Sequence, residues 1–117
     1  MKVNSKIHGI LDYGSILLLW ASPTLFGLPE ITTYFTYVLG FVHLLLTIST
    51  NFEVGLIKLI PLKIHGLIEI VVAVALVAVA FYLGSIEGAF ARNYYLVFAG
   101  ILGGLWFLTE YKVKAVG

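Results

Sequence analysis

Lys6-Ile7-His8-Gly9-Ile10-Leu11-Asp12 returns later in the chain as Lys63-Ile64-His65-Gly66-Leu67-Ile68-Glu69, and each copy opens a long apolar run. This repetition predicts a duplicated pair of helices, with one repeat at about 6–53 and the other at about 63–112. Residues four apart lie on one face of a helix. We therefore expect His8 and Asp12 to point the same way, and His65 and Glu69 likewise.

The composition indicates a membrane protein. The 117 residues allow a single domain over 1–117. Hydrophobic residues make up 61% of the chain and charged residues 11%, whereas a soluble domain carries about 25% charged residues. The net charge of +1 gives no basic patch for nucleic acid, so we expect the lipid bilayer and not nucleic acid as a partner. The absence of cysteine excludes disulfides, thiolate metal sites and cysteine-ligated iron–sulfur clusters.

Four apolar runs approach the roughly 20 residues that a membrane-spanning helix needs: 7–28, 31–50, 63–84 and 94–111. The predicted fold is therefore all-α, a four-helix transmembrane bundle made of two parallel two-helix repeats. A middle connection at 51–62 and a third connection at 85–93 join these helices.

The basic residues predict how the bundle is oriented. In a four-span arrangement one side carries six lysines and the other side carries Arg92; the six are Lys2, Lys6, Lys58, Lys63, Lys112 and Lys114. The positive-inside rule then places both termini and the middle connection in the cytoplasm. His8 and His65 would lie at equal depth near that face, with Asp12 and Glu69 about 6 Å deeper.

Polar residues also recur along one face of the second predicted helix, at three- and four-residue steps. They are Thr33, Thr36, Gly40, His43, Thr47 and Thr50. We expect this face to turn inward, because unpaired polar groups in hydrocarbon are costly. For His43 alone, a hydrogen bond to a neighbouring helix is the simpler interpretation, and a role as a ligand is the alternative.

The two His–carboxylate pairs predict a polar site near the cytoplasmic face. The leading hypothesis is a protein that binds or conducts a small ligand, cation or proton there, through His8, Asp12, His65 and Glu69. Glu53 and Lys58 would cover this site, and His43 would extend it inward.

Four interpretations of the His–carboxylate pairs remain open. His8, Asp12, His65 and Glu69 could hold a divalent metal such as zinc, iron or manganese. The two histidines could be axial ligands of a haem. The cluster could form a proton path with the polar face of the second helix. Each carboxylate could instead pair with its own histidine or a lysine and have a purely structural role.

The fourth predicted helix is rich in small residues, including a Gly100–Gly104 pair and an Ala99–Gly103 pair. Tight packing within the bundle is favoured over a dimer face. A structural module that packs against a larger membrane partner or a second copy through Gly100 and Gly104 is nevertheless the alternative function. A metal-dependent membrane enzyme is the second alternative.

The stretch Lys-Ile-His-Gly-Ile-Leu-Asp-Tyr at 6–13, followed by Ala21-Ser22-Pro23 and Leu25-Phe26-Gly27, resembles the SPW-repeat proteins, small bacterial integral membrane proteins. The segment 50–61 and the following Lys63-Ile64-His65 resemble the link between the two repeats there. Thr24 stands where the tryptophan of that motif follows Ser22-Pro23. The resemblance implies a four-helix fold in the bacterial inner membrane. It implies no activity, cofactor or catalytic residue.

Overall fold

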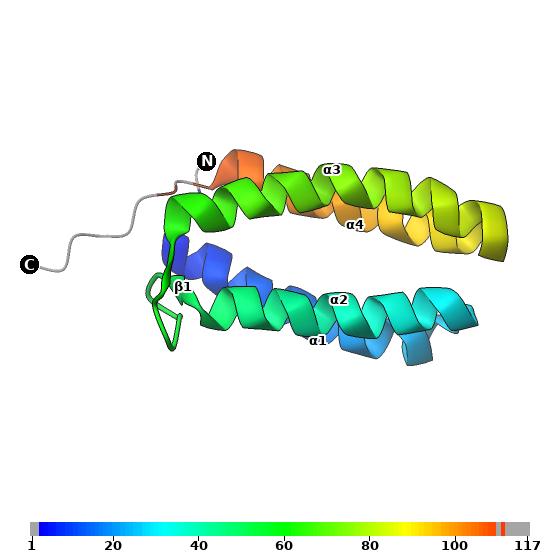
Figure 1. Cartoon of the computed structure of the whole chain (residues 1–117), viewed down its shortest axis with the longest axis horizontal. Coiled ribbons are helices and arrows are strands. Elements are labelled where there is room, and N and C mark those ends of the chain that lie inside the picture. Colours follow the sequence, from blue (N-terminus) through cyan, green and yellow to red (C-terminus); the bar gives the residue numbers. More distant parts are fainter. Residues whose placement is uncertain (1–2, 110, 112–117) are drawn as a thin grey trace, which may run out of the picture.

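The computed structural model describes residues 3–109 and 111, and Figure 1 shows them as four long helices that run side by side. Helix α1 covers Ser5–Phe26 and α2 covers Glu30–Ile48; α3 covers Leu62–Glu87 and α4 covers Ala89–Leu108. The two strands are β1 at Thr50–Asn51 and β2 at Ile60–Pro61. The all-α prediction with four helices is thus confirmed.

Helices α1 and α2 form the first hairpin, and local chemistry sets its ends. The Asn4 side chain caps α1 by accepting a hydrogen bond from the Ile7 backbone N–H at 2.8 Å. Gly27 ends α1, and Pro29 immediately precedes α2. Pro23 lies inside α1, as the sequence predicts.

The second hairpin turns more abruptly than the sequence suggested. The third connection was expected at 85–93, but α3 continues to Glu87 and α4 starts at Ala89. Gly88 alone separates the two helices, with a φ of 105°. A side chain rarely tolerates this backbone conformation, so glycine permits the reversal within one residue. The residues expected in a loop are therefore helical.

Three helices, α1, α2 and α3, are long and apolar enough to cross a membrane. Helix α4 is not among them, since Arg92 and Asn93 near its start lower its mean hydropathy. The outer surface of the bundle is largely apolar. Leu25, Val74 and Phe107 are 69%, 66% and 75% exposed.

The two hairpins are joined by polar contacts along their length. The Thr36 and Tyr95 hydroxyls lie 2.5 Å apart, between α2 and α4. The Tyr94 hydroxyl donates to Ser22 at 2.7 Å, between α4 and α1. Far from the middle connection, the Glu87 carboxylate accepts from the backbone N–H and hydroxyl of Thr32, each at 2.6 Å. Glu87 thereby satisfies donors at the start of α2.

The polar face of α2 turns inward nearly as predicted. Thr36, Gly40, His43, Thr47 and Thr50 are buried, but Thr32 is buried where Thr33 was expected, and Thr33 is half-buried. On α4, Gly103 faces α3, with a Cβ there 3.9 Å from Ala73. A Cβ at Gly100 or Gly104 would meet nothing in the described chain within 4 Å.

The segment between α2 and α3 folds back onto the end of the bundle. Strands β1 and β2 pair in parallel, Thr50 with Ile60. Phe52 follows β1 and is 1% exposed. At the same end, Val3 and Thr109 form an isolated parallel bridge beside the end of α4. These contacts hold Thr50, Phe52 and Thr109 around the starts of α1 and α3.

Candidate metal centre

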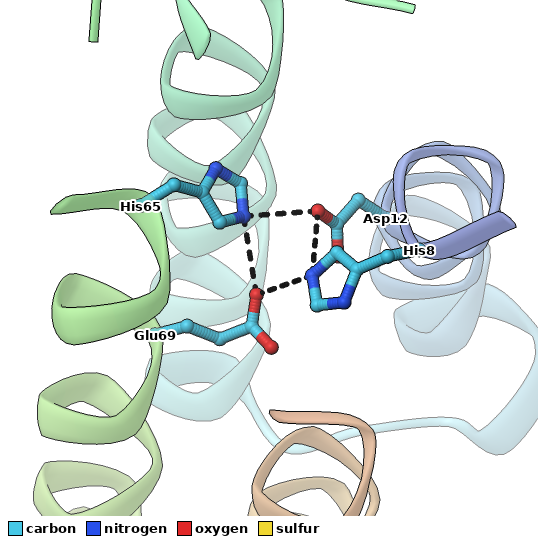
Figure 2. Close-up of side chains that lie close together, drawn as sticks. All are labelled: His8, Asp12, His65 and Glu69. Atoms are coloured by element: carbon cyan, nitrogen blue, oxygen red, sulfur yellow. Dashed lines mark hydrogen bonds and ion pairs between the residues drawn. The ribbon is translucent and has the colours of Figure 1, made fainter. Parts of the chain in front are cut away.

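Two histidines and two carboxylates meet at the end of the bundle that carries the middle connection. His8 and Asp12 come from α1, and His65 and Glu69 from α3 (Figure 2). One ligand atom from each residue can be chosen so that all four lie within 4.8 Å of one another. His8, Asp12 and His65 are 0% exposed and Glu69 is 3% exposed. The structure therefore brings the four predicted side chains into one buried cluster.

The contacts within this cluster run around a closed ring of four atoms (Figure 2). Glu69 Oε2 lies 2.8 Å from His8 Nε2 and 3.1 Å from His65 Nε2. Asp12 Oδ2 lies 3.0 Å from His65 Nε2 and 3.3 Å from His8 Nε2. Each ring nitrogen thus faces one carboxylate from its own helix and one from the other hairpin.

The opposite nitrogen of each imidazole contacts a threonine. His8 Nδ1 is 2.6 Å from Thr109 Oγ1, and His65 Nδ1 is 2.7 Å from Thr50 Oγ1. These contacts cross between hairpins, because Thr109 follows α4 while His8 begins α1, and Thr50 follows α2 while His65 begins α3. Each imidazole is therefore oriented by the hairpin to which it does not belong.

The threonines also determine which nitrogen carries a proton. A hydroxyl has one proton to donate. Thr109 donates it to the Leu105 carbonyl at 2.6 Å, and Thr50 donates to the Leu46 carbonyl at 2.6 Å. Both hydroxyls must then accept from the imidazoles, so Nδ1 carries hydrogen in His8 and His65. In the neutral state of each ring, the Nε2 lone pair points at the carboxylates.

This arrangement leaves two charge-balanced ways to fill the centre. Two neutral imidazoles facing two carboxylates would bury two uncompensated negative charges, which is strongly unfavourable. Two added protons on the Nε2 atoms restore neutrality, and so does one divalent cation. Asp12 Oδ1 and Oδ2 and Glu69 Oε1 make no hydrogen bond to the described residues.

Two aromatic rings close over the histidines. Phe52 lies against His65 with ring centroids 5.7 Å apart, and Tyr111 lies against His8 at 5.5 Å. Gly9, next to His8, leaves room for Phe52, because a Cβ at this position would lie 2.7 Å from the Phe52 ring. Gly66, next to His65, leaves room for Tyr111 in the same way, because a Cβ there would lie 2.9 Å from the Tyr111 ring. The repeated His-Gly pair thus makes room for the ring that covers the other histidine.

His43 and Glu53 lie outside the group of four. His43 Nε2 is 3.6 Å from Asp12 Oδ1, which is beyond hydrogen-bond distance, and the ring makes no hydrogen bond with the described residues. Glu53 is exposed and accepts hydrogen bonds from Ser5 at 2.6 and 2.8 Å, so it fastens the middle connection to the start of α1. Lys58 is exposed.

The geometry bears on two of the interpretations of the cluster. Each histidine Nε2 contacts both carboxylates, and the two imidazole centroids are 5.6 Å apart at nearly right angles. Carboxylate oxygens therefore lie where a haem iron would have to bind both Nε2 atoms, so this geometry does not support the haem alternative. In the structural interpretation, the pairing of each carboxylate with its own histidine is present, Asp12 with His8 and Glu69 with His65. The pairing with lysine is not, because Lys6 and Lys63 are exposed and the ion pairs of both carboxylates within the described chain involve only histidines.

Sequence reasoning missed the threonines that orient the histidines and the aromatic rings that cover them. A signal was present in the sequence, since a threonine is followed two residues later by an aromatic residue just after the second helix of each half, as Thr50 and Phe52 and as Thr109 and Tyr111. The sequence analysis places Thr50 only on the polar face of the second helix. In comparisons with known proteins, no family model, curated protein or solved structure matches the chain.

Proposed function

We propose that this protein is an integral membrane protein that binds one divalent transition-metal ion through His8, Asp12, His65 and Glu69. The observation that carries this proposal is the pair of threonine contacts. They direct both Nε2 lone pairs toward two carboxylate oxygens in a buried space, and a divalent cation neutralises that set. A hydrogen bond of this kind to the other ring nitrogen fixes the tautomer of metal-bound histidines in known metal sites.

The donor set favours zinc, iron or manganese, because imidazole and carboxylate together suit these ions. In a tetrahedral zinc site with bonds of about 2.0–2.1 Å, neighbouring ligand atoms lie about 3.3–3.4 Å apart. The four contacts around the ring are 2.8, 3.0, 3.1 and 3.3 Å. These four contacts are close to that spacing, but the widest separation among the four ligand atoms is up to 4.8 Å. Tetrahedral zinc would therefore draw the widest pair closer together, and zinc is the first ion to test because the ring contacts are near its ligand spacing.

The membrane placement rests on the apolar surface and the distribution of charge. Three helices can span a bilayer, and large apolar side chains cover the outside of the bundle. Lys6, Lys58 and Lys63 belong to the end that carries the metal centre, and Arg92 belongs to the other end. The positive-inside rule then puts the centre and both termini on the cytoplasmic side. With the SPW-repeat resemblance, this favours four spans in the bacterial inner membrane.

The alternative function is a structural module that associates with a second copy or a larger membrane partner. It is favoured by Gly100 and Gly104, whose exposed backbone meets nothing in the described chain. In that case the centre holds two protons in place of a metal and serves as a cross-link between the hairpins.

Metal content separates the two functions. The experiment compares the detergent-purified wild type, the Asp12→Asn/Glu69→Gln double variant and Glu53→Gln, which removes a carboxylate outside the centre. Elemental analysis follows growth with zinc, iron and manganese, and purified protein stripped of metal is titrated with Zn²⁺. We expect about one metal ion per chain in the wild type and in Glu53→Gln, and none in the double variant, since it lacks both charges that balance the cation.

Circular dichroism checks that the double variant remains helical. A metal-free wild type that takes up no Zn²⁺ at micromolar concentrations would refute the metal site. Equal Zn²⁺ binding by the folded double variant would show that the ion lies elsewhere.

A further inference from the structure

A second feature of the molecule is an apolar cavity of about 330 Å³ beside the metal centre, between α2, α3 and α4. Leu39 and Leu46 of α2 and Val72 of α3 form its walls. The buried side chains Phe98 and Leu102 of α4 also line it. Neither metal binding nor the joining of the hairpins requires this space.

Two polar side chains line the same cavity, His43 and Glu69. His43 is 9% exposed, and its Nε2 faces Asp12 Oδ1 of the centre at 3.6 Å, beyond hydrogen-bond distance. Glu69 uses Oε2 for both histidines of the centre, while Oε1 has no partner there and points away from the two rings in Figure 2. The two polar side chains that line this otherwise apolar cavity thus each carry an atom with no hydrogen bond to the described residues, Oε1 of Glu69 and the ring of His43.

We propose that this cavity binds a lipid-soluble molecule whose body is apolar and whose head carries a hydroxyl group. The hydroxyl would donate to Glu69 Oε1 or pair with His43, and the apolar walls would hold the body. An apolar cavity of about 150 Å³ holds benzene, so 330 Å³ suits a molecule of roughly two fused rings. A negatively charged head group is disfavoured by the two carboxylates of the centre.

The ligand would enter from the side of the bundle. Val42 and Leu45 line the cavity and are 55% and 51% exposed, so its mouth lies on the α2 face that contacts lipid in the proposed membrane placement. The inference rests on that placement and on the free polar groups. It does not require the metal, because Oε1 is separate from the oxygen that faces the histidines.

The test uses 1-naphthol as the probe and naphthalene as its matched control without the hydroxyl group. Binding to the detergent-purified full chain is measured by equilibrium dialysis against protein-free micelles. We expect saturable binding of 1-naphthol and about fivefold weaker binding of naphthalene, the difference of one net hydrogen bond. In His43→Leu we expect the preference for 1-naphthol to fall.

Cavity-filling variants locate the site. Val72→Trp fills the cavity and should abolish saturable binding, and Leu39→Trp repeats the test from the opposite wall. Val74→Trp places the same side chain on an exposed position of α3 and should bind as the wild type does. Equal binding by Val72→Trp and Val74→Trp, or no preference for 1-naphthol in the wild type, would overturn the proposal. Zn²⁺ titration of each variant reports separately on the metal centre.

Discussion

Replacing Thr50 or Thr109 by valine tests the chemistry on which the proposed metal centre depends. Valine has nearly the shape of threonine but has no hydroxyl oxygen. In Thr50→Val the Nδ1–H of His65 loses its acceptor, and in Thr109→Val the same happens to His8. Both imidazoles are 0% exposed, so water does not replace the lost partner.

The expected magnitude follows from two effects. A buried donor left without a partner costs about 1–3 kcal/mol. The imidazole can also move its proton to Nε2, which removes the lone pair that would bind the ion. Loss of the hydrogen-bond partner of a metal-bound histidine typically weakens metal affinity about 10–100-fold. We expect each single variant to fall in this range, with similar values for Thr50 and Thr109 because the two contacts are alike.

The assay is a competition titration with Zn²⁺ and a chromophoric chelator, using detergent-purified protein. Thr47→Val is the matched control. Thr47 is also 0% exposed, but its hydroxyl donates only to the His43 carbonyl within α2, at 2.8 Å. Its replacement should leave zinc affinity within about threefold of the wild type, because the Thr47 hydroxyl bonds neither histidine of the centre. Equal zinc affinities in Thr50→Val, Thr109→Val and Thr47→Val would refute the proposal that Thr50 and Thr109 decide which imidazole nitrogen carries the proton.

Two further predictions concern proton balance and packing. If the metal-free centre holds two protons, Zn²⁺ uptake near pH 7 should release about two protons per ion, and the apparent affinity for Zn²⁺ should fall as the pH decreases. A titration in weak buffer with a pH indicator measures the protons released. A release near zero would contradict the proposed charge balance. Gly9→Ala should lower the free energy of unfolding by about 1–3 kcal/mol, since its Cβ would lie 2.2 Å from Val54. The Cβ added by Gly14→Ala on the same helix would meet nothing within 4 Å, so this variant should raise the free energy of unfolding by about 0.5–1 kcal/mol. Denaturation in detergent measures the stability of both variants. An equal loss of stability in the two would refute the packing argument.

Much of the centre followed from helical periodicity. His8 with Asp12 and His65 with Glu69 are one turn apart, so each pair shares a helix face wherever the helix packs. Periodicity also predicted that most of the polar face of α2 is buried. It placed Thr33 inside, whereas Thr32 is buried because it bonds to Glu87 across the hairpins. A contact between distant residues decided that position.

The extent of the second hairpin could not be read from hydropathy. Arg92 and Asn93 suggested a loop, yet both are helical because Gly88 alone completes the turn. Glu53 was expected over the site and instead bonds Ser5. Its position depends on the path of the middle segment, which is set by the β1–β2 pairing and not by local sequence.

The sequence by itself determined four helices and two His–carboxylate faces, because the period of a helix fixes which residues share a side. Only the tertiary structure decided that the two faces meet, since helix rotation depends on packing between the hairpins. It also decided which nitrogen of each imidazole faces the carboxylates, because Thr50 and Thr109 reach those rings only across the hairpin boundary.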